Sequence, residues 1–457
     1  MLLTSLKNKT FLFRKDFGFV GNFAMLRSSA SDKDEKRKLE CDVIIDPKRT
    51  KLEVEKVEKK LNHSFRSKQK LPIHMRYAKQ PLFQNKDIFK ETEYYFENGF
   101  RKVHPYYFDF NTFCKGRWLG KTLREVYTTE FSLYPIEHYE RAVLEGGVKV
   151  NLKPVVSLDV KLRDNDMISA RLHRHEAPVL DTKVEIIEDN SKYVVVNKPS
   201  SIPIHPCGRF RNNSLVYILA KDLGYQGLLG CHRIDRLTSG IVIFGKTKNI
   251  AHKVAKEISE RKVEKQYVCK VVGEFPSTDI VCNEPVSLFN RKLGYAVAWK
   301  VEGVVGKEAS TWFTRMSYDG TNSVVLCKPK TGRTHQIRVH LQYLGFPIIN
   351  DPIYNHPAWG EERFKVGRCT RGLGEVVDQI SKQFLQTKDE QKQIMKESLA
   401  SMSEAPAVDG DRYAPSCVEC IKPLPDPNPQ SLFIYLHALS YKGPDWEFKT
   451  NMPAWAN

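Results

Sequence analysis

From Val184 to Tyr441 the sequence repeats short runs of β-branched and other apolar residues that are separated by turn residues. Such runs favour strands, because these side chains pack well on a pleated surface. A helical pattern at 249–261 lies between two of the runs. Short strands with few helices predict an α+β fold with a large mixed or antiparallel sheet. The runs are VEIIEDN, KYVVVNKP, GIVIFGKT, KQYVCKVVGE, STWFTRM, SVVLCKP and, last, SLFIYLHALSY.

One segment interrupts the strand-rich region. Residues 360–430 hold a polar helical run at 375–400 and then an acidic, proline-rich loop. Long stretches of this kind in a compact domain usually lie on its surface. We therefore predict a domain over 184–457 that carries a surface insertion at 360–430.

A pattern of two helices and a hairpin precedes this domain. In RWLGKTLREVYTTEF the apolar residues from Leu119 to Tyr127 fall on one helical face, and YPIEHYERAVLEGG repeats the pattern until two glycines end it. The runs VKVNLKPVV and DNDMISARL then predict a hairpin and a further strand. Together they predict a small separate module over 115–180. A chain of 457 residues has room for two or three such units.

The N-terminal part of the chain differs from the rest in composition. Residues 1–30 carry five Lys and Arg side chains, one acid and several phenylalanines. This is typical of a mitochondrial transit segment, although a disordered terminus fits equally, so mitochondrial, cytoplasmic and nuclear locations stay open. Residues 31–90 are highly charged and predict a disordered linker or a loose RNA-contacting arm. Ordered structure is expected to begin near Tyr94.

The overall charge points to a class of partner. Lys and Arg number 72 against 54 Asp and Glu, which gives a net charge of +18. Positive charge favours polyanions such as RNA, although a solvated basic surface would give the same total. No run approaches the roughly 20 apolar residues that span a bilayer. We expect a soluble monomer with no membrane partner.

The ten cysteines are scattered along the chain, which favours a reducing compartment. Only Cys417 and Cys420 form a CxxC pair, and a tetrahedral zinc site would need a second pair that the nearby sequence lacks. We therefore predict no metal. A zinc deaminase would need an H-x-E motif as well. His138 and Glu140 supply one, but it lies at the other end of the chain and inside the helical module, so we reject that function.

Two segments combine residues that can carry chemistry. In GCHRIDRLTSGIVIF, residues 230–244, Asp235 lies between two arginines just before a strand. In KPKTGRTHQIRVHLQYLGFPIINDPIY, residues 328–354, a glycine turn leads into a helix that ends at Gly345, and Arg338 borders its apolar stripe. Alone, Asp235 and its arginines could form a surface ion pair of little consequence.

These two segments resemble the signature segments of the RluA-type pseudouridine synthases. The likeness includes KYVVVNKPSSIPIHP and EKQYVCKV, and it covers most of residues 115–355 together with the last strand. The helix pair and GGVKVNLKPV resemble the small RNA-binding domain, shared with a ribosomal protein, that often precedes such enzymes. The resemblance implies a pseudouridine synthase domain preceded by an RNA-binding module.

The resemblance also implies roles for individual residues. Asp235 is similar to the catalytic aspartate, Tyr267 to the tyrosine that stacks on the target base, and Arg338 to the basic residue that pairs with the aspartate. Arg233 is similar to the arginine that fills the gap left by the flipped nucleotide. The neighbouring His232 and Arg236 of the same motif are expected to bind RNA as well.

The residues support these roles on physical grounds. Isomerisation of uridine is neither oxidation nor hydrolysis, so it requires no redox cofactor or metal, and we predict no cofactor. An ionised carboxylate can act as a nucleophile or can stabilise an oxocarbenium ion. Unstacking the uridine costs a few kcal/mol, part of which an aromatic ring and a guanidinium can recover.

Two further tracts suggest the substrate. NGFRKVHPYYFDFNTFCKGRW and YKGPDWEFKTNMPAW resemble the eukaryotic branch of the family that modifies tRNA at position 32 of the anticodon stem-loop. The expected function is therefore uridine isomerisation in structured RNA, with tRNA as the partner. The alternative is a catalytically silent RNA-binding or chaperone protein with the same fold.

Overall fold

A computed structural model describes residues 90–131, 134–290, 295–298, 304–368, 371–381, 393, 396–397, 412–415 and 417–457. The targeting segment at 1–30 and almost all of the linker at 31–90 lie outside these residues, so both remain predictions. Most of the helical run expected at 375–400 also lies outside them, while residues 373–381 are helical.

A 10-stranded sheet forms the centre of the described chain. Its order is β13-β16-β17-β12-β18-β11-β9-β8, with β10 on β11 and β19 on β18. Neighbours are antiparallel except β11 and β18, which pair in parallel. This confirms the predicted α+β fold. The strands are β8 (Glu185–Asp189), β9 (Tyr193–Lys198), β10 (Leu229–Gly230), β11 (Ser239–Gly245), β12 (Glu264–Val272), β13 (Ile280–Cys282), β16 (Thr311–Tyr318), β17 (Asn322–Pro329), β18 (Leu436–Lys442) and β19 (Glu447–Lys449).

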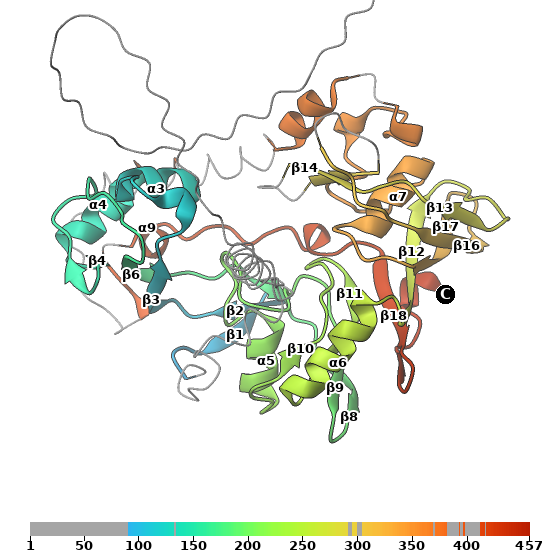
Figure 1. Ribbon diagram of the computed structural model, residues 1–457, viewed down its shortest axis with the longest axis horizontal. Coiled ribbons are helices and arrows are strands. Elements are labelled where there is room, and N and C mark those ends of the chain that lie inside the picture. The colour runs from blue at the N-terminus through green and yellow to red at the C-terminus, as the bar shows by residue number, and fades with distance from the viewer. Residues whose placement is uncertain are drawn as a thin grey trace, which may run out of the picture. The chain divides into compact units, whose positions relative to one another are not determined.

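Helices pack on this sheet through apolar faces. α6 (Lys248–Ser259) confirms the helix expected at 249–261, and it lies beside β11 (Figure 1). It begins after Thr247, whose side chain accepts a hydrogen bond from the Ile250 amide. α5 (Leu215–Asp222) is buried along almost its whole length. α7 (Gln336–Leu344) packs Ile337 and Leu341 into the core beneath β12 and β17.

A 4-stranded sheet in the order β3-β6-β4-β5 forms the module before the main sheet. The expected hairpin is confirmed as β4 (Val148–Val150) and β5 (Lys153–Pro154), and the following strand as β6 (Met167–Arg174). β3 (Tyr106–Phe113) pairs with β6 along its whole length. α3 (Leu123–Glu130) and α4 (Ile136–Leu144) complete the module, and α4 contacts β4 and β6 (Figure 1).

The start of α3 corrects one sequence expectation. Leu119 was expected on the apolar face of the helix, but it lies before the helix and is 48% exposed. The reason is local, because Thr122 and Glu125 form a capping box that starts the helix at Leu123. Trp118, at the end of the 3-10 helix η3 (Gly116–Trp118), is buried in the module core instead.

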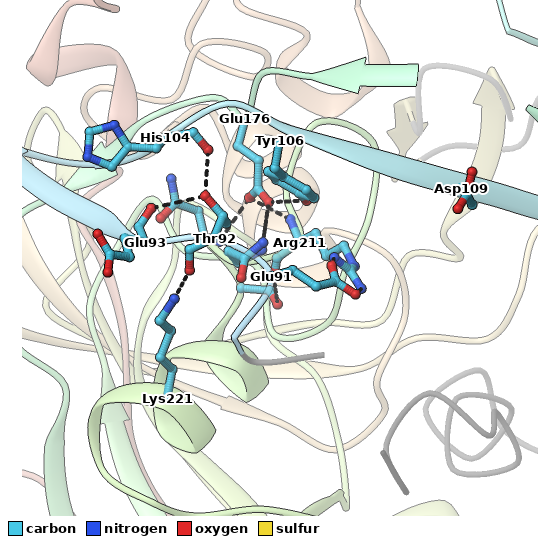
Figure 2. A network of polar contacts seen from close by, with 12 residues as sticks. Glu91, Thr92, Glu93, His104, Tyr106, Asp109, Glu176, Arg211 and Lys221 are labelled. Atoms are coloured by element: carbon cyan, nitrogen blue, oxygen red, sulfur yellow. Dashed lines mark hydrogen bonds and ion pairs between the residues drawn. The ribbon is translucent and has the colours of Figure 1, made fainter. Parts of the chain in front are cut away.

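A buried polar network connects the module to the segment that leads into α5. The Glu176 carboxylate accepts hydrogen bonds from the Tyr106 hydroxyl (2.8 Å) and from the amides of Arg211, Asn212 and Asn213 (2.8, 2.8 and 2.9 Å) (Figure 2). The Arg211 side chain in turn pairs with Glu91 (Figure 2). The Asn212 side-chain amide donates as well (3.1 Å), and a buried carboxylate with five donors is fully satisfied, so it ties these segments together.

The remaining described elements are short. A 3-stranded sheet has the strand order β1-β2-β7. Its first strand begins at Tyr94, the residue near which regular structure was expected to begin. Among the described residues, no helix has the length and apolar character needed to cross a membrane. These elements are β1 (Tyr94–Glu97), β2 (Phe100–Val103), β7 (Val179–Leu180), β14 (Ser287–Asn290), β15 (Tyr295–Val297), η4 (Pro357–Trp359), η5 (Lys365–Gly367), α9 (Val418–Ile421), η7 (Pro429–Leu432) and η8 (Ala454–Ala456).

Candidate active site

Asp235 lies in the turn between β10 and β11, in the middle of the large sheet. Its carbonyl accepts a hydrogen bond from the Thr238 amide (3.2 Å), which closes the turn just before β11. The chain then passes very close to β18 at Gly240, whose φ is +110°. A Cβ at this position would lie 2.3 Å from the Ala438 carbonyl oxygen, so only glycine fits. This close approach fixes the position of the turn, and so of Asp235, relative to β11 and β18.

Lys198, the last residue of β9, supports the same turn from below. Its Nζ donates hydrogen bonds to the carbonyls of Pro199 (2.8 Å), Ile202 (3.0 Å) and Arg236 (3.2 Å). Burial lowers the pKa of Lys198 to about 7, and the charge of Arg236 adds to this effect. This lysine therefore joins the loop after β9 to the residue that follows Asp235.

Arg338 on α7 connects two carboxylates. Its Nε and Nη2 lie 2.6 and 2.9 Å from the oxygens of Asp351, and its Nη1 lies 3.3 Å from Oδ2 of Asp235. Asp351 also accepts hydrogen bonds from the amides of Ile353 and Tyr354, both 3.0 Å. The side chain of Arg338 is only 4% exposed, whereas that of Asp235 is 31% exposed. The two-point ion pair with Asp351 thus aims the remaining nitrogen at a carboxylate that solvent and substrate can reach.

His335 and Tyr354 complete the wall around Arg338. His335 has a left-handed backbone conformation at the start of α7 and places its Nε2 3.7 Å from Oδ2 of Asp235. Its Nδ1 is 2.8 Å from the Tyr354 hydroxyl, which accepts a hydrogen bond from the Ala296 amide. The Tyr354 ring stacks on the Arg338 guanidinium at 4.9 Å. These contacts restrict both basic groups to one position.

The charges around Asp235 determine its protonation state. Burial by itself would raise the pKa of Asp235, but the nearby His335, Arg338 and Arg233 outweigh burial and hold this pKa below its ordinary value. Burial lowers the pKa of His335 to about 4, so this imidazole is neutral at neutral pH. At neutral pH the positive charges that keep Asp235 ionised are therefore those of Arg338 and Arg233. An ionised, accessible carboxylate can act on an electrophilic carbon.

Tyr267 lies on β12, the strand that pairs with β18. Its hydroxyl hydrogen-bonds to the hydroxyl of Tyr441 on β18, and the two rings meet edge to face at 6.1 Å. Burial raises the pKa of Tyr267 to about 12; the hydrogen bond to Tyr441 opposes the rise, and the charge of Asp235 adds to it. The ring of Tyr267 is only partly buried.

The other three residues expected in the site differ in their exposure. Arg233 is exposed, as a residue that contacts RNA must be. Arg236 is partly buried and lies 5.4 Å above the Phe210 ring. His232 is buried, its Nε2 accepts a hydrogen bond from the Ile243 amide (3.1 Å), and its ring lies 4.6 Å from that of Tyr441. The RNA-binding role of all three remains a prediction.

Sequence reasoning missed four residues that organise the site. His335, Asp351 and Tyr354 belong to the second motif, residues 328–354, and Lys198 belongs to KYVVVNKP, so all four lay inside segments already singled out. Pairing of Arg338 with an acid 13 positions away could not be read from helical spacing. A buried arginine in an apolar helix does require a partner, and that requirement was the available signal.

Comparisons with known proteins identify relatives of this chain. The family model described as RNA pseudouridylate synthase matches residues 192–343, which include Lys198, Asp235, Tyr267 and Arg338. Pseudouridylate synthase RPUSD2 of Mus musculus is 42% identical over 410 residues, 80% of this chain and 73% of that protein. In Saccharomyces cerevisiae, the mitochondrial tRNA pseudouridine(32) synthase is 36% identical over 389 residues, 82% of this chain and 80% of that protein. The tRNA pseudouridine(31) synthase of the same organism is 32% identical over 411 residues, 80% of this chain and 98% of that protein.

Proposed function

This chain belongs to the RNA pseudouridine synthase family, and from that membership we propose that it converts uridine to pseudouridine at position 32 of tRNA, with Asp235 as the catalytic group. The observation that carries the proposal is the ionised Asp235 carboxylate, held 3.3 Å from the buried guanidinium of Arg338 and open to substrate. A silent RNA-binding protein would have no need of such an arrangement.

The reaction is balanced without any further reactant. The bond between N1 of uracil and C1′ of ribose breaks, the base turns, and a bond forms between C5 and C1′. The proton lost from C5 is matched by one gained at N1. Asp235 either attacks C1′ or stabilises the positive charge that develops on the ribose, and both roles require the carboxylate to be ionised. The charge of Arg338 favours that state.

The neighbouring residues suit a flipped nucleotide. Tyr267 offers a partly buried ring, on which a base can stack with a gain of roughly 1–3 kcal/mol. Arg233 is exposed beside the same turn, so it can occupy the space from which the base has left. Phosphate contacts from Lys and Arg of the small module would supply most of the affinity.

The proposal of tRNA position 32 and the proposal of a mitochondrial location rest on different observations. The relatives named for position 32 and for position 31 are 36% and 32% identical to this chain, so identity favours position 32 only slightly. One of these relatives is named as mitochondrial, and residues 1–30 are basic and poor in acids. We propose that at least part of the protein enters mitochondria; a fluorescent reporter fused to residues 1–30 would remain diffuse if that is incorrect.

The substrate proposal is tested with purified protein and anticodon stem-loop transcripts. Three transcripts carry uridine at position 32 only, at position 31 only, or at neither, and pseudouridine is measured by mass spectrometry. We expect product only from the first. Product only from the second would move the proposal to position 31. Tight binding of all three without product would favour the silent RNA-binding alternative.

A further inference from the structure

Two histidines and two cysteines from distant parts of the chain converge on one point. His173, in β6, and His175, directly after it, meet two cysteines: Cys417, which directly precedes α9, and Cys420, which lies within α9. One ligand atom from each of the four lies within 4.8 Å of all the others. α9 lies beside β6 (Figure 1), although 242 residues separate His175 from Cys417.

The distances match those between the ligands of a tetrahedral zinc ion. Cys417 Sγ lies 3.4 Å from Nε2 of His175, and Cys420 Sγ lies 3.3 Å from the same nitrogen and 3.4 Å from Nδ1 of His173. Zinc bonds of about 2.3 Å to sulfur and about 2.0–2.1 Å to nitrogen at a tetrahedral angle separate S and N by roughly 3.6 Å. The four side chains therefore surround a space of the size that this ion needs.

The local backbone explains why all four side chains point inward. Alternate residues of an extended chain face the same side, so the H-x-H spacing of His173 and His175, at the end of β6, places two imidazoles on one side. The C-x-x-C spacing places its two sulfurs together because the Cys420 amide bonds to the Cys417 carbonyl in a tight turn (3.1 Å). The Ala414 amide donates to the Cys420 sulfur at 3.5 Å, a contact that suits a thiolate.

The surroundings fix the ligands further. Arg209 pairs with the buried carboxylate of Glu419, between the two cysteines, and donates to the carbonyl of His175 at 3.3 Å. His173 and Cys417 are buried, and His175 and Cys420 are partly buried. Outer contacts of this kind orient metal ligands and are a regular part of metal sites.

We propose that His173, His175, Cys417 and Cys420 bind one zinc ion. Two thiolates and two imidazoles in tetrahedral order favour zinc over harder cations. Four protein ligands leave no open position, so the ion serves structure rather than catalysis. It joins α9, near the end of the 360–430 segment, to β6 of the small module. None of the ligands lies on the elements that carry Asp235, Tyr267 or Arg338, so this inference is independent of the proposed function.

The prediction of no metal rested on the absence of a second ligand pair near Cys417 and Cys420 in the sequence. The second pair is the H-x-H of HRHE, residues 173–176. Its distance in sequence exceeds that of common zinc motifs, and only the folded chain brings the two pairs together.

The test measures zinc directly. The full chain is expressed with zinc, purified without chelator under reducing conditions, and analysed by inductively coupled plasma mass spectrometry. We expect about one zinc per chain. A double variant, Cys417→Ser with Cys420→Ser, and a second, His173→Ala with His175→Ala, should each lose it. Cys207→Ser with His252→Ala removes an exposed cysteine and an exposed histidine and should keep it.

The wild-type protein alone provides a second measurement if the variants fail to fold. Removal of zinc with a chelator should lower Tm by several degrees, and stoichiometric Co²⁺ should restore it with the absorption of a tetrahedral sulfur-ligated ion. The proposal would be overturned if the zinc content were well below one per chain and if added Co²⁺ gave no absorption of a tetrahedral sulfur-ligated ion. A Cys417–Cys420 disulfide in the reduced preparation, or zinc that both double variants retain, would also overturn it.

Discussion

Arg338 reaches Asp235 with a single nitrogen, Nη1, which lies 3.3 Å from Oδ2 of the carboxylate. Its other two nitrogens, Nε and Nη2, donate hydrogen bonds to the carboxylate of Asp351 at 2.6 and 2.9 Å. A guanidinium held in this way supplies a fixed positive charge without enclosing the carboxylate, because it donates only one hydrogen bond to it. Asp235 is thus ionised and remains accessible on its other side.

Replacing Asp235 with Asn should abolish pseudouridine formation and leave RNA binding nearly intact. The amide keeps the size of the side chain but removes the charge that both mechanisms require, and loss of such a group commonly lowers kcat by several powers of ten. Affinity rests on many phosphate contacts and should change little. Single-turnover assays and a binding titration check this. Asp445→Asn, in an exposed pair with Lys253, is the matched control and should behave like wild type. Turnover within tenfold of wild type in folded Asp235→Asn protein would contradict the proposed mechanism.

Replacing Arg338 with Lys should lower kcat by about 10- to 100-fold. The reason is that an ammonium group cannot bind Asp351 at two points and still reach Asp235. This decrease corresponds to the loss of about 1.5–3 kcal/mol, the contribution of a charged hydrogen bond. The acid limb of the pH–rate profile should also move to higher pH. The charge of Arg338 lowers the pKa of Asp235, so weakening that charge raises the pKa, and the carboxylate is then lost at a higher pH. Arg315→Lys, in a partly exposed pair with Glu274, should change neither quantity. An unmoved acid limb would show that Arg338 does not control the ionisation of Asp235.

Replacing Gly240 with Ala should disrupt the site through the backbone. The added Cβ would lie 2.3 Å from the Ala438 carbonyl oxygen at a φ of +110°, so β11 and β18 must separate or the turn with Asp235 must move. We expect a clear fall in Tm and in kcat. Gly116→Ala, at a position where a Cβ meets nothing within 4 Å, is the control and should alter neither. A Gly240→Ala protein with wild-type Tm would show that the close approach of the two strands is not required.

The free energy of unfolding should fall as the pH decreases from about 6.5 to 4. Burial lowers the pKa of His340 and of His437 to about 4, whereas histidine in an unfolded chain titrates near 6.5. Between these values the unfolded chain binds protons that the folded chain does not, so acid favours unfolding, by up to about 3 kcal/mol per histidine.

Urea denaturation at several pH values measures this slope. His340→Gln should flatten it, because an amide can replace both hydrogen bonds of the imidazole, to Thr311 and to the Glu284 carbonyl, and does not titrate. His252→Gln, at an exposed position, should leave the slope unchanged. An equal slope in both variants would mean that His340 does not contribute to the acid sensitivity.

The fold class could be predicted from the sequence because its signals are local. Runs of β-branched residues indicated the strands of the large sheet, and a glycine followed by proline marked the end of α7 at Gly345, whose φ of +88° only glycine adopts easily. The same kind of reasoning was wrong at Leu119, because an apolar pattern does not reveal that the capping box of Thr122 starts the helix later.

The sequence by itself determined the strand-rich domain, the helix pair with its hairpin, and the segments that contain Asp235, Tyr267 and Arg338. Only the tertiary structure decided that Arg338 is buried against Asp351, that β18 lies between β11 and β12, and that His173 and His175 meet Cys417 and Cys420. The reason is physical. Periodicity and turn residues report on neighbours within a few positions, whereas these contacts join segments whose distance is set by the packing of the whole sheet.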